Sequence, residues 1–180
     1  MKTVVVGMGD CKVTGEPVEM VTFALGSCIA VVIWDPVARV GGMLHFMLPD
    51  SSVDRETQGR ANPYRYADTG TPLLFRRAYE MGAEKRRLQV RLAGGANVVD
   101  SGGVFNIGKR NHAAVRKILW KAGVLVHGEE VGGTVSRTVR LDMSTGRCTV
   151  HEPSGAAREL RAGAAVPAPA PAGGTECRVA

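Results

Sequence analysis

Short apolar stretches along the chain have the pattern of β-strands, and two longer stretches have the spacing of helices. The longest unbroken apolar run, residues 29–34, is rich in β-branched residues and predicts a strand that is buried on both faces. Asp35-Pro36 then favours a turn, and residues 40–48 predict the antiparallel partner strand. The other predicted strands are residues 3–6, 18–25, 88–92, 124–127, 135–141 and 147–151.

Two segments have helical periodicity. Thr71-Pro72 is a favourable helix start, because a hydroxyl group can cap the first turn and proline fits within it, and Gly82 is a favourable end. A second helix is predicted at about residues 109–122. Residues 49–70 are polar and predict a long surface loop. Strands outnumber helices without a βαβ rhythm, so the sequence predicts an α+β fold.

The chain has 180 residues, which is enough for one domain with a sizeable core. We place this domain at residues 1–160. Residues 161–180 are rich in alanine and proline and predict a disordered tail that cannot bury a core. No apolar run approaches the ~20 residues that a membrane-spanning helix needs, and no signal-peptide pattern is apparent. We therefore expect a cytoplasmic protein without membrane insertion.

The net charge of +6 comes from clustered lysines and arginines. These clusters have two interpretations: attraction to an acidic partner, or solvated helix faces. Only 5% of the residues are aromatic, which leaves few side chains for base stacking and argues against nucleic-acid binding. Without a signal-peptide pattern, the four cysteines are expected to be reduced thiols. They form no CxxC pair, and we expect no metal site and no cofactor.

Candidate chemistry lies at Cys28, which follows Gly26 and Ser27, and at His45, which lies 17 residues later. A thiol beside an imidazole can act as a nucleophile with its base. If residues 35–38 form a four-residue turn, Cys28 lies directly opposite His45, with Cβ atoms about 4.5–5.5 Å apart. A one-residue slip would place the two side chains on opposite faces of the sheet.

The residues before the thiol suit a nucleophile. Gly26 permits a positive φ, and Gly26 and Ser27 are small enough for a substrate to approach the backbone. The backbone N–H of Cys28 could help to hold an oxyanion. A second interpretation stays open at this point, in which Cys28 is a buried structural thiol and His45 a hydrogen-bonded core residue. Thr22 supplies a hydroxyl group in the same segment.

Further short motifs accompany the cysteine and the histidine. They are Leu25-Gly26-Ser27-Cys28-Ile29-Ala30-Val31, Asp35-Pro36, Gly42-Met43-Leu44-His45-Phe46-Met47-Leu48-Pro49, Tyr66-Ala67-Asp68, Ala93-Gly94-Gly95-Ala96, Asn106-Ile107-Gly108-Lys109-Arg110-Asn111, Gly132-Gly133 and Thr145-Gly146. Together, over about residues 3–152, these motifs resemble the CheD family of chemoreceptor glutamine deamidases. The combination is specific, whereas no single motif is.

The resemblance implies a cysteine hydrolase that converts glutamine side chains of methyl-accepting chemotaxis receptors to glutamate and releases ammonia. It implies a catalytic triad, which falls on Cys28, His45 and Thr22. It also implies a layered α/β sandwich of mixed sheets flanked by helices, similar to the deamidase domains of cytotoxic necrotizing toxins. The implied partners are the receptors, at their cytoplasmic domains, and in some family members the phosphatase CheC. We expect a monomer.

This chain departs from the family pattern in its Ala/Pro tail and in a longer loop at residues 50–66, neither of which contains a triad residue. The alternative function is a non-catalytic binding module, with a vestigial cysteine, that regulates a CheC-like phosphatase or receptor signalling. The intact Thr22, Cys28 and His45 argue against that alternative.

Overall fold

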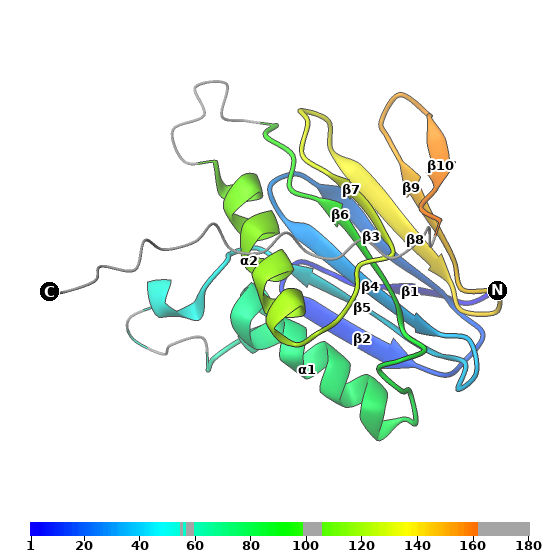
Figure 1. Cartoon of the computed structure of the whole chain (residues 1–180). Coiled ribbons are helices and arrows are strands. Elements are labelled where there is room, and N and C mark those ends of the chain that lie inside the picture. The colour runs from blue at the N-terminus through cyan, green and yellow to red at the C-terminus, as the bar shows by residue number, and fades with distance from the viewer. Residues whose placement is uncertain (55, 57–59, 99–105, 162–180) are drawn as a thin grey trace, which may run out of the picture.

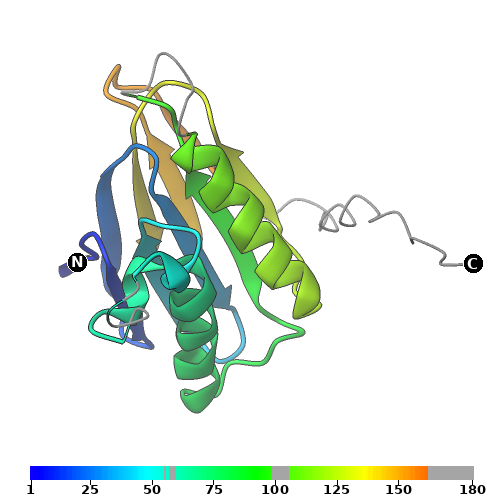
Figure 2. The same cartoon turned by 90° about the vertical axis from the view of Figure 1, so that its left-hand side faces the viewer.

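Two five-stranded β-sheets lie face to face, and two α-helices cover the outer face of one of them (Figures 1 and 2). The computed structural model describes residues 1–54, 56, 60–98 and 106–161. The first sheet has the strand order β1 (Thr3–Val5), β3 (Glu19–Leu25), β8 (Arg137–Asp142), β9 (Arg147–His151) and β10 (Ala157–Glu159). The second has the order β2 (Asp10–Thr14), β5 (Val40–Phe46), β4 (Ile29–Asp35), β6 (Gln89–Gly94) and β7 (Gly128–Val131).

The helices that cover the second sheet are α1 (Ala67–Glu80) and α2 (Ile107–Lys121), and two short 3₁₀ helices, η1 (Ser51–Val53) and η2 (Pro63–Arg65), precede α1. Each sheet contains one parallel pair, β1 with β3 and β6 with β7, among antiparallel neighbours. The prediction of an α+β fold with mixed sheets and flanking helices is confirmed at this level.

Strand β4 lies at the centre of the second sheet and is buried along its whole length. Its side chains alternate between two cores. Ile29, Val31 and Ile33 pack toward the helices, whereas the residues between them pack toward the first sheet. This explains the unbroken apolar run, since burying each side chain of this size stabilises the folded state by about 1.5–3 kcal/mol relative to leaving it exposed.

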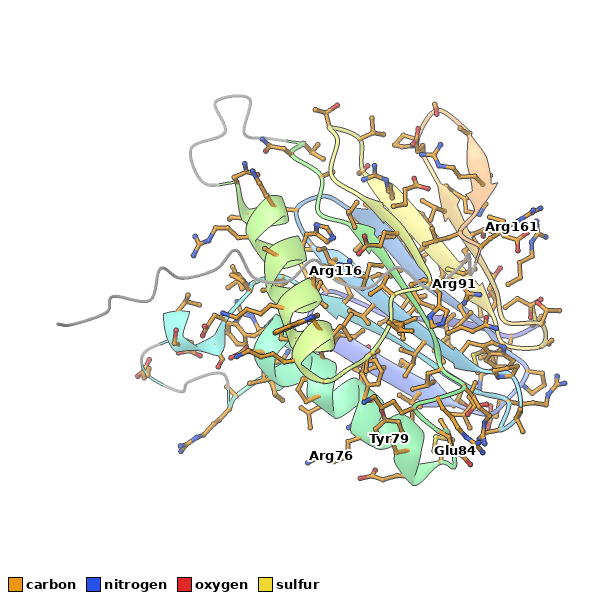
Figure 3. All side chains as sticks on the ribbon, viewed as in Figure 1. Arg76, Tyr79, Glu84, Arg91, Arg116 and Arg161 are labelled. Carbon is orange, nitrogen blue, oxygen red and sulfur yellow. The ribbon has the colours of Figure 1, made fainter. Side chains whose placement is uncertain are left out.

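The side chains of α1 divide in the same way. Leu74 and Ala78 are buried against the second sheet, whereas Arg76 and Tyr79 lie on the exposed side of the helix (Figure 3). No helix in the described part of the chain is both long and apolar enough to span a bilayer.

The turn between β4 and β5 differs from the predicted one. Asp35 pairs with Val40, so the connection consists of residues 36–39, with Arg39 at a φ of 54°. The Asp35 carboxylate accepts hydrogen bonds from the backbone N–H groups of Val37 and Ala38, at 2.9 and 3.0 Å. Asp35 therefore ends the strand and caps the turn, instead of being its first residue.

This change moves the register of the hairpin. Ala30 lies opposite His45, so the prediction that Cys28 would lie there was wrong. Continuing the pairing by one position past Ile29 and Phe46 places Cys28 level with Met47, two residues from His45. A displacement of two residues preserves the face, because side chains alternate with a period of two. Cys28 and His45 therefore still face the first sheet.

Helix α1 begins four residues before its predicted start, so Pro72 lies inside the helix. The N–H of Ala67 donates to the carbonyl of Leu48 at 2.9 Å, and Asp68 lies in the first turn, where a negative charge favours the helix dipole. The loop predicted at residues 49–70 is correspondingly shorter and contains η1 and η2.

The strand predicted at residues 124–127 was also misplaced. The N–H of Val124 donates to the carbonyl of Leu119 at 2.9 Å and closes the end of α2, so β7 begins only at Gly128. The short strands β2 and β10 were not predicted at all. The tail predicted at residues 161–180 lies outside the described residues, apart from Arg161.

Candidate active site

The two sheets bring a hydroxyl, an imidazole and a thiol to the same end of the space between them. Thr22 lies on β3 of the first sheet, His45 lies on β5 of the second, and Cys28 immediately precedes β4. Cys28 packs against the core between the sheets. Cys28 lies one position beyond the last ladder pair and is thus diagonal to His45. In a regular ladder, diagonal neighbours lie about 7–8 Å apart, within reach of long side chains.

A hydrogen bond fixes the imidazole. Thr22 Oγ1 lies 2.8 Å from His45 Nδ1, and both side chains are buried. Strand β3 is irregular just after Thr22: its pairing with β8 shifts between Thr22 and Leu25, and Ala24 adopts a φ of 51°. Because this bulge absorbs one extra residue, Phe23 and Ala24 turn outward while Thr22 and Leu25 stay buried.

The imidazole of His45 is neutral at physiological pH. Burial lowers its pKa from 6.5 to about 4, and the nearby backbone of Val6 offsets only part of that effect. Nε2 is buried and has no hydrogen-bond partner among the described residues. With Nδ1–H donating to Thr22 Oγ1, the Nε2 lone pair is available to accept a proton.

Cys28 is the accessible thiol among the three cysteines within the described residues. It is partly exposed, whereas Cys11 and Cys148 are buried. Burial raises the pKa of the Cys28 thiol, and its own backbone N–H partly counteracts this. Burial raises the pKa of Cys11 and of Cys148 to about 12 each. At neutral pH the site therefore holds a protonated thiol and a neutral imidazole. The thiol makes no hydrogen bond to Nε2, as is common before a substrate binds.

The loop that carries the thiol is held by backbone contacts from the end of β6. The carbonyl of Gly26 accepts from the N–H of Ala96, and the carbonyl of Cys28 accepts from the N–H of Gly95, both at 2.7 Å. Gly94 has a φ of 112°, and a Cβ there would lie 2.3 Å from the Cys28 oxygen. Only glycine allows this approach.

Gly26 permits a positive φ but does not adopt one. Among the described glycines, those with positive φ in this region are Gly94 and Gly95. Ser27 lies beside Gly26 in the same loop, and its carbonyl accepts a hydrogen bond from Asn111 Nδ2 at 2.9 Å. The small residues before the thiol thus lie in the loop before β4, whereas the glycines with positive φ lie at the end of β6.

Three residues of this region were missed as site residues: Gly94, Gly95 and Asn111. All three belong to motifs that contributed to the family resemblance, but no role for these residues was evident from the sequence. The motifs are Ala93-Gly94-Gly95-Ala96 and Asn106-Ile107-Gly108-Lys109-Arg110-Asn111. No group of three or more His, Cys, Asp or Glu side chains within the described ranges is arranged to hold a metal ion.

Comparisons with known proteins agree with these motifs. Residues 47–152 match the family described as CheD chemotactic sensory transduction. The probable chemoreceptor glutamine deamidase CheD of Solibacter usitatus is 53% identical over 161 residues, covering 89% of this chain and 94% of the relative. The probable chemoreceptor glutamine deamidase CheD 2 of Anaeromyxobacter dehalogenans is 55% identical over 152 residues, covering 84% of this chain and 95% of that protein. The chemoreceptor glutamine deamidase CheD of Thermotoga maritima is 41% identical over 151 residues, covering 84% of this chain and 92% of that protein.

The family match begins at Met47, after all three side chains of the site. The Solibacter alignment nevertheless spans them, because 161 aligned residues leave 19 of 180 outside and must include residues 20–161. Among solved structures, the Bacillus licheniformis hypothetical protein YfiH is similar with a TM-score of 0.39 and 15% identity over 69% of this chain and 50% of that chain. A similarity this low carries no argument about function.

Proposed function

The chain belongs to the CheD family, and we propose on that basis that it is a chemoreceptor glutamine deamidase that uses Cys28 as its nucleophile. The observation that supports the nucleophile is the hydrogen bond of 2.8 Å between Thr22 and His45. It leaves Nε2 free on the face that Cys28 also occupies. An imidazole held in this way, beside the accessible thiol, is the arrangement that covalent acyl transfer requires.

The first half of the proposed reaction forms a thioester. His45 Nε2 takes the proton of the Cys28 thiol as Sγ attacks the side-chain amide carbon of a receptor glutamine. A C–S bond forms, and the amide oxygen becomes an oxyanion, which the backbone N–H of Cys28 helps to hold. His45 then gives its proton to the leaving nitrogen, the C–N bond breaks, and ammonia departs.

The second half returns the enzyme to its starting state. His45 takes a proton from water, the hydroxide attacks the thioester carbon, and the C–S bond breaks. The glutamate side chain leaves, and Sγ recovers the proton from His45. Thr22 holds the imidazole in one tautomer through both halves. Gly26 and Ser27 keep the approach to the thiol free of large side chains.

The neutral resting pair fits this order of events. A thiolate–imidazolium pair would require a raised histidine pKa and a lowered cysteine pKa, whereas burial shifts both in the opposite direction. Proton transfer therefore accompanies the attack on the substrate instead of preceding it. The imidazole is available as the acceptor, since with a pKa of about 4 it is unprotonated throughout the neutral range.

The proposal extends to partners and setting. The substrate is the cytoplasmic part of a chemoreceptor, with a CheC-like phosphatase as a regulatory partner, and the enzyme acts as a cytoplasmic monomer. The deamidase domains of cytotoxic necrotizing toxins are the proposed structural relatives. Each of these points follows from the resemblance and stays a prediction.

The decisive test is ammonia release from a glutamine-bearing receptor fragment. Wild-type protein is compared with Cys28→Ala, and Cys11→Ala serves as the control because Cys11 is a buried thiol on β2. We expect Cys28→Ala to abolish ammonia release and the accompanying conversion of glutamine to glutamate, measured by mass spectrometry, while Cys11→Ala retains both. Equal rates for wild type and Cys28→Ala would exclude Cys28 as the nucleophile.

A further inference from the structure

A single buried amide joins the two chain segments that carry the thiol and the imidazole. Asn111 lies on α2 and is fully buried. Its Nδ2 donates to the carbonyl of Ser27 at 2.9 Å and to the carbonyl of Met47 at 2.8 Å. Ser27 directly precedes Cys28, and Met47 follows His45 by two residues.

These contacts lie where the β-ladder has ended. The last pair between β4 and β5 is Ile29 with Phe46, so Cys28 and Met47 are not paired with each other. The N–H of Met47 donates instead to the carbonyl of Arg65 at 2.9 Å. Asn111 therefore connects the two strands at the position where the next pair of ladder hydrogen bonds is missing.

The helix that carries Asn111 is held against the same loop. A Cβ at Gly108 would lie 2.2 Å from the carbonyl oxygen of Gly95, so the first turn of α2 is in backbone contact with that residue. The N–H of Gly95 in turn donates to the carbonyl of Cys28 at 2.7 Å. The position of Asn111 is thus set by the glycine segment that also holds the thiol loop.

The orientation of the Asn111 amide follows from its two hydrogen bonds. Because carbonyl oxygens only accept hydrogen bonds, the amide group that faces the two carbonyls must be the NH₂ group, Nδ2. Oδ1 is buried and has no hydrogen-bond partner among the described residues. An apolar side chain of similar size would avoid this unsatisfied oxygen, but it could not bridge the two carbonyls. The contact of Asn111 with the loop therefore accounts for a polar residue on the buried face of α2.

We infer that Asn111 is a positioning residue, which sets the distance of Cys28 from His45 for proton transfer. The inference rests on the deamidation proposed above. Cys28 and His45 are diagonal neighbours and not a directly paired couple, and a misplacement of about 1 Å is enough to slow a step that depends on geometry, such as proton transfer between Sγ and Nε2. Asn111 itself is buried and touches neither atom.

The first experiment compares Asn111→Ala with Val115→Ala in the full chain. Val115 lies one turn further along α2 and is equally buried, but it packs in the core between helix and sheet. We expect Asn111→Ala to lower kcat at least tenfold while KM changes less than twofold. Val115→Ala should stay within twofold of wild type in both. If Asn111→Ala does not fold, Asn111→Leu, which fills a similar volume and cannot bridge the two carbonyls, replaces it.

The second experiment needs no receptor. Iodoacetamide alkylation of Cys28 is followed across pH by mass spectrometry of its peptide, in wild type, His45→Ala, Asn111→Ala and the double variant. In the wild-type background, we expect His45→Ala to change the alkylation rate of Cys28 at least threefold, because the proposed base for the thiol is lost. In the Asn111→Ala background, the same substitution should change it by less than 1.5-fold.

The outcomes separate the two proposals. An equal effect of His45→Ala in both backgrounds, together with a kcat for Asn111→Ala equal to that of Val115→Ala, overturns the positioning role and leaves deamidation intact. Absence of ammonia release by the wild-type protein overturns the deamidation, and the alkylation series then still decides whether Asn111 couples the thiol to the imidazole.

Discussion

Thr22 Oγ1 lies 2.8 Å from His45 Nδ1, and this hydrogen bond crosses from one β-sheet to the other. The orientation of the imidazole therefore depends on how the two sheets pack, and not on the hairpin that carries His45. Because both side chains are buried, water cannot replace the hydroxyl group. In the tautomer in which Nδ1–H donates to Thr22 Oγ1, Nε2 is the accepting nitrogen, and the bond links the fold directly to the proposed chemistry.

Replacing Thr22 by valine removes the hydroxyl group and keeps the shape of the side chain. His45 Nδ1 then loses its partner, and the imidazole can rotate or change tautomer. We expect kcat for ammonia release to fall about 10–100-fold, with a loss of about 1–3 kcal/mol in the free energy of unfolding. Steady-state kinetics and urea unfolding measure the two effects.

Thr22→Ser is the matched control, since it retains the hydroxyl and removes one methyl group. It should keep kcat within about threefold of wild type. If valine and serine at this position have the same kcat, the hydroxyl does not orient the base.

The pKa of His45 predicts the acid limit of activity. Burial lowers this pKa to about 4, from an ordinary value of 6.5. Because the base must be unprotonated in the free enzyme, kcat/KM should rise as the pH increases through about 4 and then stay level through neutral pH. An alkaline decline should follow above the ordinary pKa of a thiol, because burial raises the pKa of Cys28.

The measurement is the pH profile of kcat/KM between pH 3.5 and 10, with the fold checked at each pH by circular dichroism. The apparent values belong to the thiol–imidazole pair, since the two groups are coupled. An acid limb centred near 6.5 would show that the imidazole is solvated in the working enzyme, contrary to its burial here.

The sequence placed Cys28 and His45 on one face although the predicted register was wrong. That result follows from the period of two along a strand, because an even displacement changes the partner but not the face. The displacement itself could not be predicted. Whether Asp35 ends a strand or begins a turn depends on its carboxylate, which binds the N–H groups of Val37 and Ala38 and also the guanidinium of Arg87, 52 residues away in sequence.

Thr22 and Asn111 show the other limit of the sequence. Neither residue is near Cys28 in a strand or helix pattern, since one lies on the opposite sheet and the other on a helix. The sequence offered Thr22 only as a hydroxyl group in the segment before Cys28, and the resemblance assigned it as the third member of the site. For Asn111 the motif was visible but its contact was not, because a buried amide bridging two carbonyls leaves no periodic signal.

Asp35 predicts a loss of stability in acid. Burial alone would raise the pKa of its carboxyl group, but the hydrogen bond from Arg87 and the N–H groups of Glu84, Ala38 and Val37 lower the pKa to about 2. A folded-state pKa below the unfolded value of 3.8 means that the unfolded chain takes up a proton first as the pH falls. The contribution, about 2 kcal/mol, is therefore complete above about pH 4 and disappears between about pH 4 and 2.

Asp35→Asn should remove this dependence. At pH 7 it leaves the Arg87 guanidinium without its buried carboxylate partner, and we expect a loss of about 2–4 kcal/mol in the free energy of unfolding. Between pH 4 and 2 the difference in the free energy of unfolding between wild type and variant should narrow. Urea unfolding at four pH values measures this difference. A constant difference would mean that Asp35 does not titrate with a lowered pKa.

Gly94→Ala tests the close contact behind the thiol. Gly94 has a φ of 112°, and a Cβ there would lie 2.3 Å from the carbonyl oxygen of Cys28. Gly82 is the matched control, because it also has a positive φ, of 93°, but nothing lies within 4 Å of an added Cβ. Alanine at either position carries the backbone strain, about 1–3 kcal/mol, and only at Gly94 does it also displace the thiol loop.

We therefore expect Gly94→Ala to be about 1–3 kcal/mol less stable than Gly82→Ala in urea unfolding, because the clash adds to the strain. Its kcat should fall at least tenfold at a temperature where both variants are folded, whereas Gly82→Ala should retain wild-type kcat. The clash must move the carbonyl of Cys28 and with it the Sγ atom, since the two belong to one residue. Equal stability and equal kcat in the two variants would contradict the close packing of β6 against the thiol loop.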